Sequence, residues 1–307
     1  MTRTDVPGAP PHLKAAAMDC VQVNLAVLSE HHHGEPVALN LGAPLRFAPR
    51  FPGDALPTVE PPHGEHLAVA RTMAGVDVRG TDRATPVTQA WELAGESGGT
   101  HYVLADAFTL PWTPYHGHEH LEHSFLMTVT APDRVHVVDA YHNDTPYGNA
   151  RPGAWEFDRD RFQRELRGTA LRFGQSRTVP VRAEAVESAL ADNARHLAAA
   201  RDDAVPRYVA AYRDHDNQRE AVEALVLETW LLARSRRLHG HWLAVTHPDS
   251  ASRFSAHADD WAAFAGHCYL AARRVRRGRD APSDLYERLA ALLSGDADHA
   301  RSLAAAR

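Results

Sequence analysis

The hydrophobic pattern of the chain changes near Pro180, and this change limits the folds that the sequence can adopt. Over residues 183–305 apolar side chains recur at the spacing of amphipathic helices. Before Pro180, helical segments alternate with short strand-like runs such as 101–105 and 123–129. The sequence therefore predicts an α+β domain over residues 13–178, followed by an all-α domain over 183–305.

Composition excludes several classes of protein. The chain has 307 residues, of which 44% are hydrophobic and 23% charged, so it can bury a sizeable core. A formal net charge of −6 gives no reason to expect a nucleic-acid partner. No apolar run reaches the length of a membrane span and the N-terminus lacks the apolar core of a signal peptide, so we expect a cytoplasmic protein. The two cysteines, Cys20 and Cys268, are too few for a disulfide framework, and no CxxC pair indicates structural zinc.

Cys20 stands at the start of a segment in which Val21, Leu25 and Leu28 share one face of a helix. Asp19 precedes it and is a typical N-cap residue, which would place Cys20 in the first helical turn. Backbone N–H groups and the helix dipole favour a thiolate at that position, whereas the charge of Asp19 opposes it. This context makes Cys20 a candidate nucleophile, whereas we expect Cys268, in an apolar helical run, to be a buried hydrophobic residue.

Far downstream, one strand-like segment opens with His123 and the next one ends with Asp139. If 131–133 forms a three-residue loop, position 123 faces position 141, and Asp139 lies one diagonal step away on the same face. A two-residue loop would put Asp139 on the opposite face unless a bulge corrected the register. We predict that Asp139 orients His123, which serves as the base for the thiol of Cys20.

Covalent catalysis by a thiol also needs donors for the oxyanion that forms on the substrate. The backbone N–H of Cys20 is one candidate. Gln22 is a candidate for the second donor, although its side chain could point elsewhere, and Asn24 lies far along the helix. The second donor stays open at this point.

These residues resemble the N-terminal domain of the butirosin biosynthesis protein H family over residues 15–175. The resemblance is carried by Cys20, 41–47, 105–112, His123 and 138–139. It implies a papain-like thiol-enzyme fold with a helical C-terminal domain, in which Cys20 is the nucleophile, His123 the base and Asp139 the orienting acid. It also implies an acyltransferase of specialised metabolism, which moves an acyl group from a carrier-protein thioester onto an amine, an alcohol or an internal nucleophile.

The partners implied by the resemblance are an acyl carrier protein with a phosphopantetheine thioester, or another small thioester, and a small-molecule acceptor. We expect no cofactor, metal, membrane or nucleic acid, and a homodimer is compatible with the sequence. For substrate binding we predict a polar and four aromatic side chains, namely Gln22, Phe47, Trp112, Tyr115 and Trp242. The basic run 273–279 is a candidate docking patch for the acidic carrier, the alternative being a solvated helix end.

Three other functions stay open. A cysteine hydrolase of the same fold, acting as a peptidase, amidase or thioesterase, would use the same three residues. A non-catalytic binding protein would keep the fold with an unreactive Cys20. A metal enzyme could use the cluster His116, His118, His120 and His123 with Glu119 and Glu122, although its spacing matches no strong zinc pattern. The first three histidines would point to one side of a strand.

Overall fold

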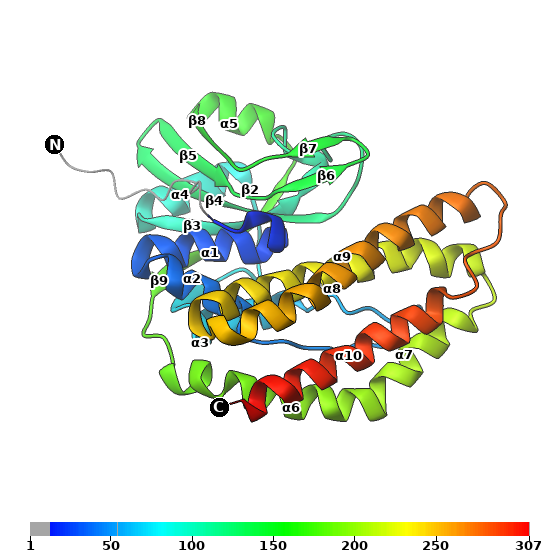
Figure 1. Ribbon diagram of the computed structural model, residues 1–307. Coiled ribbons are helices and arrows are strands. Elements are labelled where there is room, and N and C mark those ends of the chain that lie inside the picture. The colour runs from blue at the N-terminus through cyan, green and yellow to red at the C-terminus, as the bar shows by residue number, and fades with distance from the viewer. Residues whose placement is uncertain (1–12, 54, 307) are drawn as a thin grey trace. The chain divides into compact units, whose positions relative to one another are not determined.

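The computed structural model describes residues 13–53 and 55–306 (Figure 1). The described chain divides into two compact units. One unit runs up to Leu41 and continues with His63–Arg182, and the other consists of Gly42–Pro62 and the chain from Ala183 onwards. The sequence assigned 42–62 to the first domain, but this segment belongs to the helical unit because its apolar side chains, Leu45 and Phe47 among them, are buried among helices.

The first unit has an α+β fold with an antiparallel sheet, as the sequence predicted. The strands lie in the order β1 (Val76–Arg79), β9 (Ala170–Thr178), β3 (Thr100–Asp106), β4 (Glu122–Ala131), β5 (Arg134–Asp139) and β8 (Gly153–Asp158). A short strand, β2 (Ala84–Pro86), also pairs with β9. A separate hairpin is formed by β6 (Asn143–Thr145) and β7 (Gly148–Ala150).

Helices cover both faces of this sheet, as Figure 1 shows for α1 and α5. The α-helices of the unit are α1 (Cys20–His33), α2 (Glu35–Ala38), α3 (His63–Met73), α4 (Val87–Ser97) and α5 (Arg159–Glu165), with 3-10 turns η1 (Ala15–Ala17), η2 (Leu39–Gly42, which ends in the other unit) and η3 (Ala107–Thr109). On one face, Trp91 of α4 and Phe162 of α5 share a core with Phe125 of β4. Because side chains alternate along a strand, Ser124 lies on the opposite face, where α1 packs against β4.

The hairpin of β4 and β5 determines where His123 and Asp139 lie. Its loop has two residues, 132–133, and not the three that the sequence suggested. Val129 pairs with Val135 while Ala131 pairs with Arg134, so β4 contains one extra residue at this point. This bulge restores the register that the three-residue loop would have given. His123 and Asp139 consequently share one face of the sheet.

The second unit consists of helices and the extended segment 42–62. Its helices are α6 (Ala183–Asp202), α7 (Ala204–Arg213), α8 (Gln218–Thr246), α9 (Pro248–Val275) and α10 (Leu285–Ala305). The buried carboxylate of Glu228 accepts hydrogen bonds from Thr58 Oγ1 (2.8 Å) and from the backbone N–H of Val59 (2.5 Å). The hydroxyl of Tyr212 donates to the carbonyl of Pro57 at 2.6 Å. These bonds attach the extended segment to α7 and α8.

None of the helices in the described part of the chain combines the length and the apolar character that crossing a membrane requires.

A buried ionic cluster joins three helices of the second unit. The fully buried Asp296 of α10 pairs with Arg236 of α8 (Oδ2 to Nε, 3.1 Å) and with His257 of α9 (Oδ1 to Nε2, 2.7 Å). Trp261 also donates to Asp296 at 3.0 Å. Burial would raise the pKa of Asp296, but the charge of Arg236 and the hydrogen bonds of both partners lower it. Removing Asp296 would leave the charge of Arg236 buried without compensation.

We therefore expect Asp296→Ala to destabilise the helical unit by about 3–5 kcal/mol, the cost of breaking a buried ion pair. The matched control is Asp298→Ala on the same helix, which removes an exposed pair with Arg201 and should cost at most about 1 kcal/mol. Urea unfolding followed by tryptophan fluorescence measures both. Equal losses for the two variants would contradict the importance assigned to the buried cluster.

Candidate active site

Cys20 is the first residue of α1, and the helix starts there because Asp19 caps it. The carboxylate of Asp19 accepts the backbone N–H of Gln22 at 2.7 Å, and the backbone N–H of Asp19 donates to Gln22 Oε1 at 3.3 Å. This reciprocal capping box confirms the predicted cap. The amide oxygen of Gln22 is therefore engaged in the cap, and a substrate contact through its nitrogen stays a prediction.

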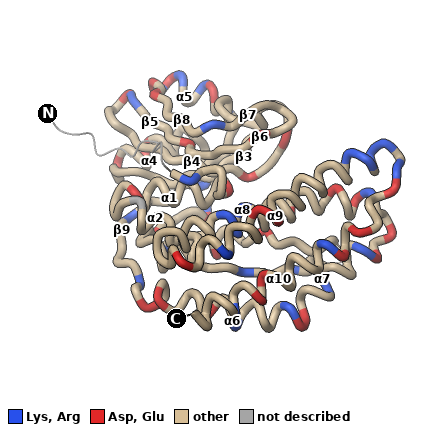
Figure 2. The backbone as a smooth tube through the Cα atoms, in the orientation of Figure 1, with Lys and Arg blue, Asp and Glu red and all other residues tan. Residues whose placement is uncertain are grey.

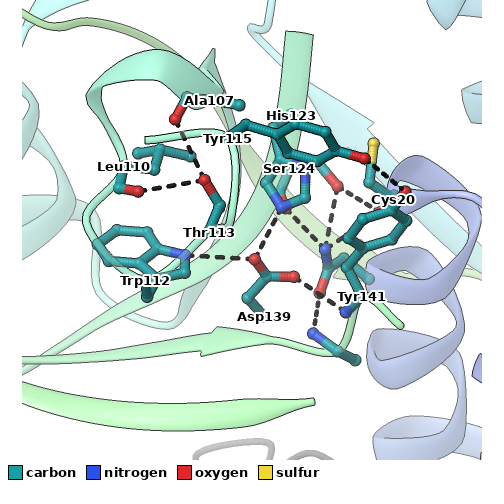
Figure 3. A network of polar contacts seen from close by, with 12 residues as sticks. Cys20, Ala107, Leu110, Trp112, Thr113, Tyr115, His123, Ser124, Asp139 and Tyr141 are labelled. Atoms are coloured by element: carbon teal, nitrogen blue, oxygen red, sulfur yellow. Dashed lines mark hydrogen bonds and ion pairs between the residues drawn. The ribbon is translucent and has the colours of Figure 1, made fainter. Parts of the chain in front are cut away.

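His123 and Asp139 form a short, buried hydrogen bond at the ends of β4 and β5 (Figure 3). His123 Nε2 lies 2.7 Å from Asp139 Oδ2, and the two residues are 1% and 5% exposed. Since the carboxylate accepts, the proton of this bond sits on Nε2. The other ring nitrogen, Nδ1, is buried and makes no hydrogen bond of ordinary geometry with a described residue. It is the atom left to exchange a proton with the thiol of Cys20.

The surroundings of His123 stabilise its protonated form. Burial by itself would lower the pKa of His123, but the charge and hydrogen bond of Asp139, followed by the hydrogen bonding and charge of Cys20, raise it well above its usual value. Cys20 Sγ lies 3.9 Å from the carbonyl of Glu122, the residue before His123, so the thiol lies at the end of the strand that carries the imidazole. A protonated imidazole at this position can deliver a proton to a leaving group.

Asp139 is itself fixed by two further donors. The indole Nε1 of Trp112 donates to Oδ2 at 3.2 Å, and the backbone N–H of Tyr141 donates to Oδ1 at 3.0 Å. Trp112 also packs on Phe125, with ring centroids 5.2 Å apart. Trp112, predicted to bind substrate, thus belongs to the site as a support for the carboxylate.

Asn24, which sequence reasoning placed too far along the helix, connects the helix to both strands. Pairing of β4 with β5 ends at Leu126 and Val138, and in the same register position 124 would face position 140. There the carboxamide of Asn24 lies between the strands, because Nδ2 donates to the carbonyl of Ser124 (2.8 Å) and Oδ1 accepts the N–H of Ala140 (3.1 Å). The signal in the sequence was a polar residue among the apolar residues of α1.

The same network includes the backbone of the nucleophile. The carbonyl of Cys20 accepts hydrogen bonds from Ser124 Oγ (2.6 Å) and from Asn24 Nδ2 (3.1 Å). The first turn of α1 is therefore attached to the strand that carries His123. This attachment fixes the backbone of Cys20 relative to that strand.

Two tyrosines extend the site beyond His123. The ring of Tyr141 lies 5.2 Å from that of His123, and its hydroxyl lies 3.4 Å from the hydroxyl of Tyr115. Tyr115 is largely buried, and Asn143 of β6 also donates to its hydroxyl, at 3.4 Å. Tyr115 thus contacts the site through Tyr141, while its predicted contact with substrate stays a prediction.

Two predicted substrate-binding residues lie in the core of the helical unit. Phe47 packs edge-on against Tyr208 with ring centroids 5.2 Å apart, and Trp242 is 1% exposed beside His239. Both are large apolar residues because they fill the core of this unit. Substrate contact by Phe47 and Trp242 does not fit these positions, because both side chains are already covered by their own unit.

The histidine-rich segment lacks the geometry that a metal site would need. His116 and His118 lie in turns and His120 in an irregular segment before β4, so their side chains do not alternate as on a strand. The ring of His118 stacks on Tyr147 at 4.8 Å, and His120 pairs with Asp106 at 2.5 Å. Within residues 13–53 and 55–306, no group of three or more His, Cys, Asp or Glu side chains is placed to hold one metal ion.

The arrangement supplies a thiol, a base and a group that orients the base, which nucleophilic catalysis requires. The N–H of Cys20, at the first position of a helix, has no intrahelical acceptor and can donate to an oxyanion. Reaction of Cys20 with an activated acyl group is the chemistry that this set of residues allows.

We predict that Asn24→Leu, which keeps the number and branching of the side-chain heavy atoms, lowers the free energy of unfolding by about 3 kcal/mol, because backbone groups of Ser124 and Ala140 lose their partners. Reaction of Cys20 with an acyl thioester should slow by about 100-fold, as expected for misplaced reacting groups. The control is Ser29→Ala on the same helix, which removes a buried bond to the carbonyl of Ala74. It should cost about 1 kcal/mol and leave the reaction rate unchanged. A folded Asn24→Leu protein that reacts at the wild-type rate would contradict this role.

Comparison of the chain with models of known protein families gave no match, and comparison with curated proteins gave no similar sequence. The evidence for the chemistry of the site thus comes from this chain's own residues.

Proposed function

We propose that this chain is a cysteine-dependent acyltransferase of specialised metabolism with a papain-like catalytic unit. The observation that carries the proposal is the buried 2.7 Å hydrogen bond from His123 Nε2 to Asp139, which leaves Nδ1 for Cys20 at the start of α1. A thiol at a helix N-terminus, packed on an antiparallel sheet with histidine and aspartate on adjacent strands, is the arrangement of papain-like enzymes. The resemblance of the sequence to the butirosin biosynthesis protein H family supports the same activity.

In the first half-reaction, His123 Nδ1 takes the proton of the Cys20 thiol, and Sγ attacks the carbonyl carbon of a thioester. The N–H of Cys20 donates to the oxyanion of the tetrahedral intermediate. The bond from carbon to the sulfur of the donor then breaks, and the departing thiolate takes the proton from His123. An acyl group is left on Cys20 as a new thioester.

In the second half-reaction, an amine, an alcohol or an internal nucleophile attacks the acyl-enzyme. His123 accepts the proton of the nucleophile, and the bond from the carbonyl carbon to Sγ breaks. The proton returns from His123 to the thiolate of Cys20, which restores the starting enzyme. Attack by water at this stage would give a thioesterase.

A carrier protein is the proposed acyl donor, and the charge of the helical unit supports it. Figure 2 shows basic residues gathered where α9 ends and the chain turns towards α10, a run that contains Arg273, Arg274, Arg276, Arg277 and Arg279. Arg276 pairs with Glu223 of α8 at 3.1 Å. The overall net charge of −6 makes this positive segment an exception on the chain. Acyl carrier proteins are acidic, so a basic segment suits their docking.

Intact-protein mass spectrometry tests the proposal with small acyl thioesters and with acyl groups on a carrier protein. We expect a mass gain of one acyl group on the wild type and on Cys268→Ala, whose thiol is buried, but none on Cys20→Ala. Asp139→Asn should form the adduct about 10²–10⁴-fold more slowly, the range for loss of acid–base catalysis. A folded wild type that gains no mass with any donor would sink the proposal, and adducts that decay only to free acid would favour the hydrolase.

A further inference from the structure

A second group of polar side chains surrounds Cys20 on the face of the sheet opposite to His123. Tyr102 of β3 is fully buried on this face, and the ring of His63, at the start of α3, stacks on it with centroids 5.7 Å apart. One turn along α3, His66 Nε2 lies 3.7 Å from the carboxylate of Asp19, the residue before the nucleophile. None of these side chains takes part in the mechanism derived above.

Three polar atoms in this group are buried and poorly paired. Both ring nitrogens of His63 and the hydroxyl of Tyr102 make no hydrogen bond of ordinary geometry with a described residue. Buried polar groups are nearly always paired in folded proteins, because an unpaired one costs about 1–3 kcal/mol. Three such atoms on two stacked side chains therefore indicate a place built to bind polar atoms of a ligand.

The hydroxyl of Tyr102 is close to the nucleophile. Burial raises the pKa of Tyr102 well above its usual value, a hydrogen bond with Ser124 opposes this, and the charges of Cys20 and Asp19 raise it further. Ser124, the neighbour of that hydroxyl, also donates from Oγ to the carbonyl of Cys20 at 2.6 Å, so Tyr102 and the nucleophile share one contact residue. A ligand atom bound by Tyr102 would thus lie beside an acyl group carried on Cys20.

His63 offers both a donor and an acceptor at neutral pH. Burial, followed by the charges of His66 and Arg172, lowers the pKa of His63 to about 4, so the ring is uncharged. A neutral imidazole accepts through one nitrogen and donates through the other, and the Tyr102 hydroxyl can do both. This set matches a hydroxyl or an amine better than an aliphatic acyl chain.

We propose that His63 and Tyr102 bind the nucleophile that accepts the acyl group, and that this acceptor presents a hydroxyl or an amine group to them. The inference rests on the proposed acyl transfer and assigns the acceptor to the α3 side of Cys20. His123 approaches Cys20 from the other face of the sheet, so a base and a bound acceptor can flank the acyl-enzyme.

The test separates the two half-reactions. Tyr102→Phe removes one hydroxyl, and His63→Phe keeps a ring to stack on Tyr102. The control is His31→Phe at the exposed far end of α1. Each protein is acylated with the N-acetylcysteamine thioester of butyrate, and the decay of the adduct is followed by mass spectrometry with ethanolamine or hydroxylamine.

We expect all four proteins, wild type included, to form the adduct at equal rates. Ethanolamine should accelerate decay of the adduct in a saturable way in wild type and His31→Phe. In Tyr102→Phe and His63→Phe the acceleration should be about 3–10-fold smaller, because a neutral hydrogen bond to the acceptor is lost. Hydroxylamine, which is small and strongly nucleophilic, should act equally on all. Equal acceleration by ethanolamine in wild type, Tyr102→Phe and His63→Phe, or no acceleration in wild type, would overturn the assignment of the acceptor site.

A binding measurement keeps the acceptor site separate from the proposed chemistry. In Cys20→Ala, which cannot be acylated, addition of ethanolamine should shift the ¹⁵N resonances of the His63 ring and not those of His31. Unchanged His63 resonances would overturn the inference even if the wild type forms an acyl-enzyme. A wild type without an adduct, but with shifted His63 resonances, would sink the acyl transfer and leave the binding site standing.

Discussion

The hydrogen bonds of the Asn24 carboxamide hold the candidate site together. They join the helix that carries Cys20 to the strands that carry His123 and Asp139, at the point where those strands stop pairing. A separation of two strands would normally leave a carbonyl and an N–H without partners, and one planar amide satisfies both. These bonds therefore stabilise the opening between the strands and attach the helix of the thiol to the strands of the imidazole and the carboxylate.

Histidine alone does not identify the site, because the chain has 21 histidines. What distinguishes His123 is a buried carboxylate on one nitrogen and a thiol near the other, which together raise its pKa in spite of burial. His239 in the helical unit is equally buried but donates from Nδ1 to the carbonyl of Gly42, and burial lowers its pKa to about 4. The same side chain is thus a proton carrier in one place and a neutral structural group in another.

Local patterns predicted much of the site. Asp19 caps α1 as predicted, while the part of Gln22 in that cap was not predicted. His123 and Asp139 share a face because alternation along strands is strict. The bulge before Ala131 could not be predicted, since a loop of two residues plus an extra strand residue leaves the same register as a loop of three. The network of Asn24 depends on where two strands separate, which is a tertiary property.

The hydrophobic pattern did not show which of the two units would bury a given side chain. Phe47 is apolar and precedes a proline-rich segment, a description that fits a substrate pocket as well as a helix core. It lies in the second unit because 42–62 is attached there by Glu228 and Tyr212, residues far away in the sequence. Hydrophobicity shows that a side chain will be covered, but not by which part of the chain it is covered.

The most direct test of the pairing between thiol and imidazole is a pH titration of His123 by NMR of the ring carbons and nitrogens. In the wild type its pKa should lie well above the 6.5 of a free histidine, with the proton of the neutral form on Nε2. In Cys20→Ala the pKa should fall, because one of the groups that raise it is gone, while Asp139 still holds Nε2. A His123 that titrates near 6.5 in the wild type, or whose pKa is the same with and without Cys20, would contradict the catalytic pair.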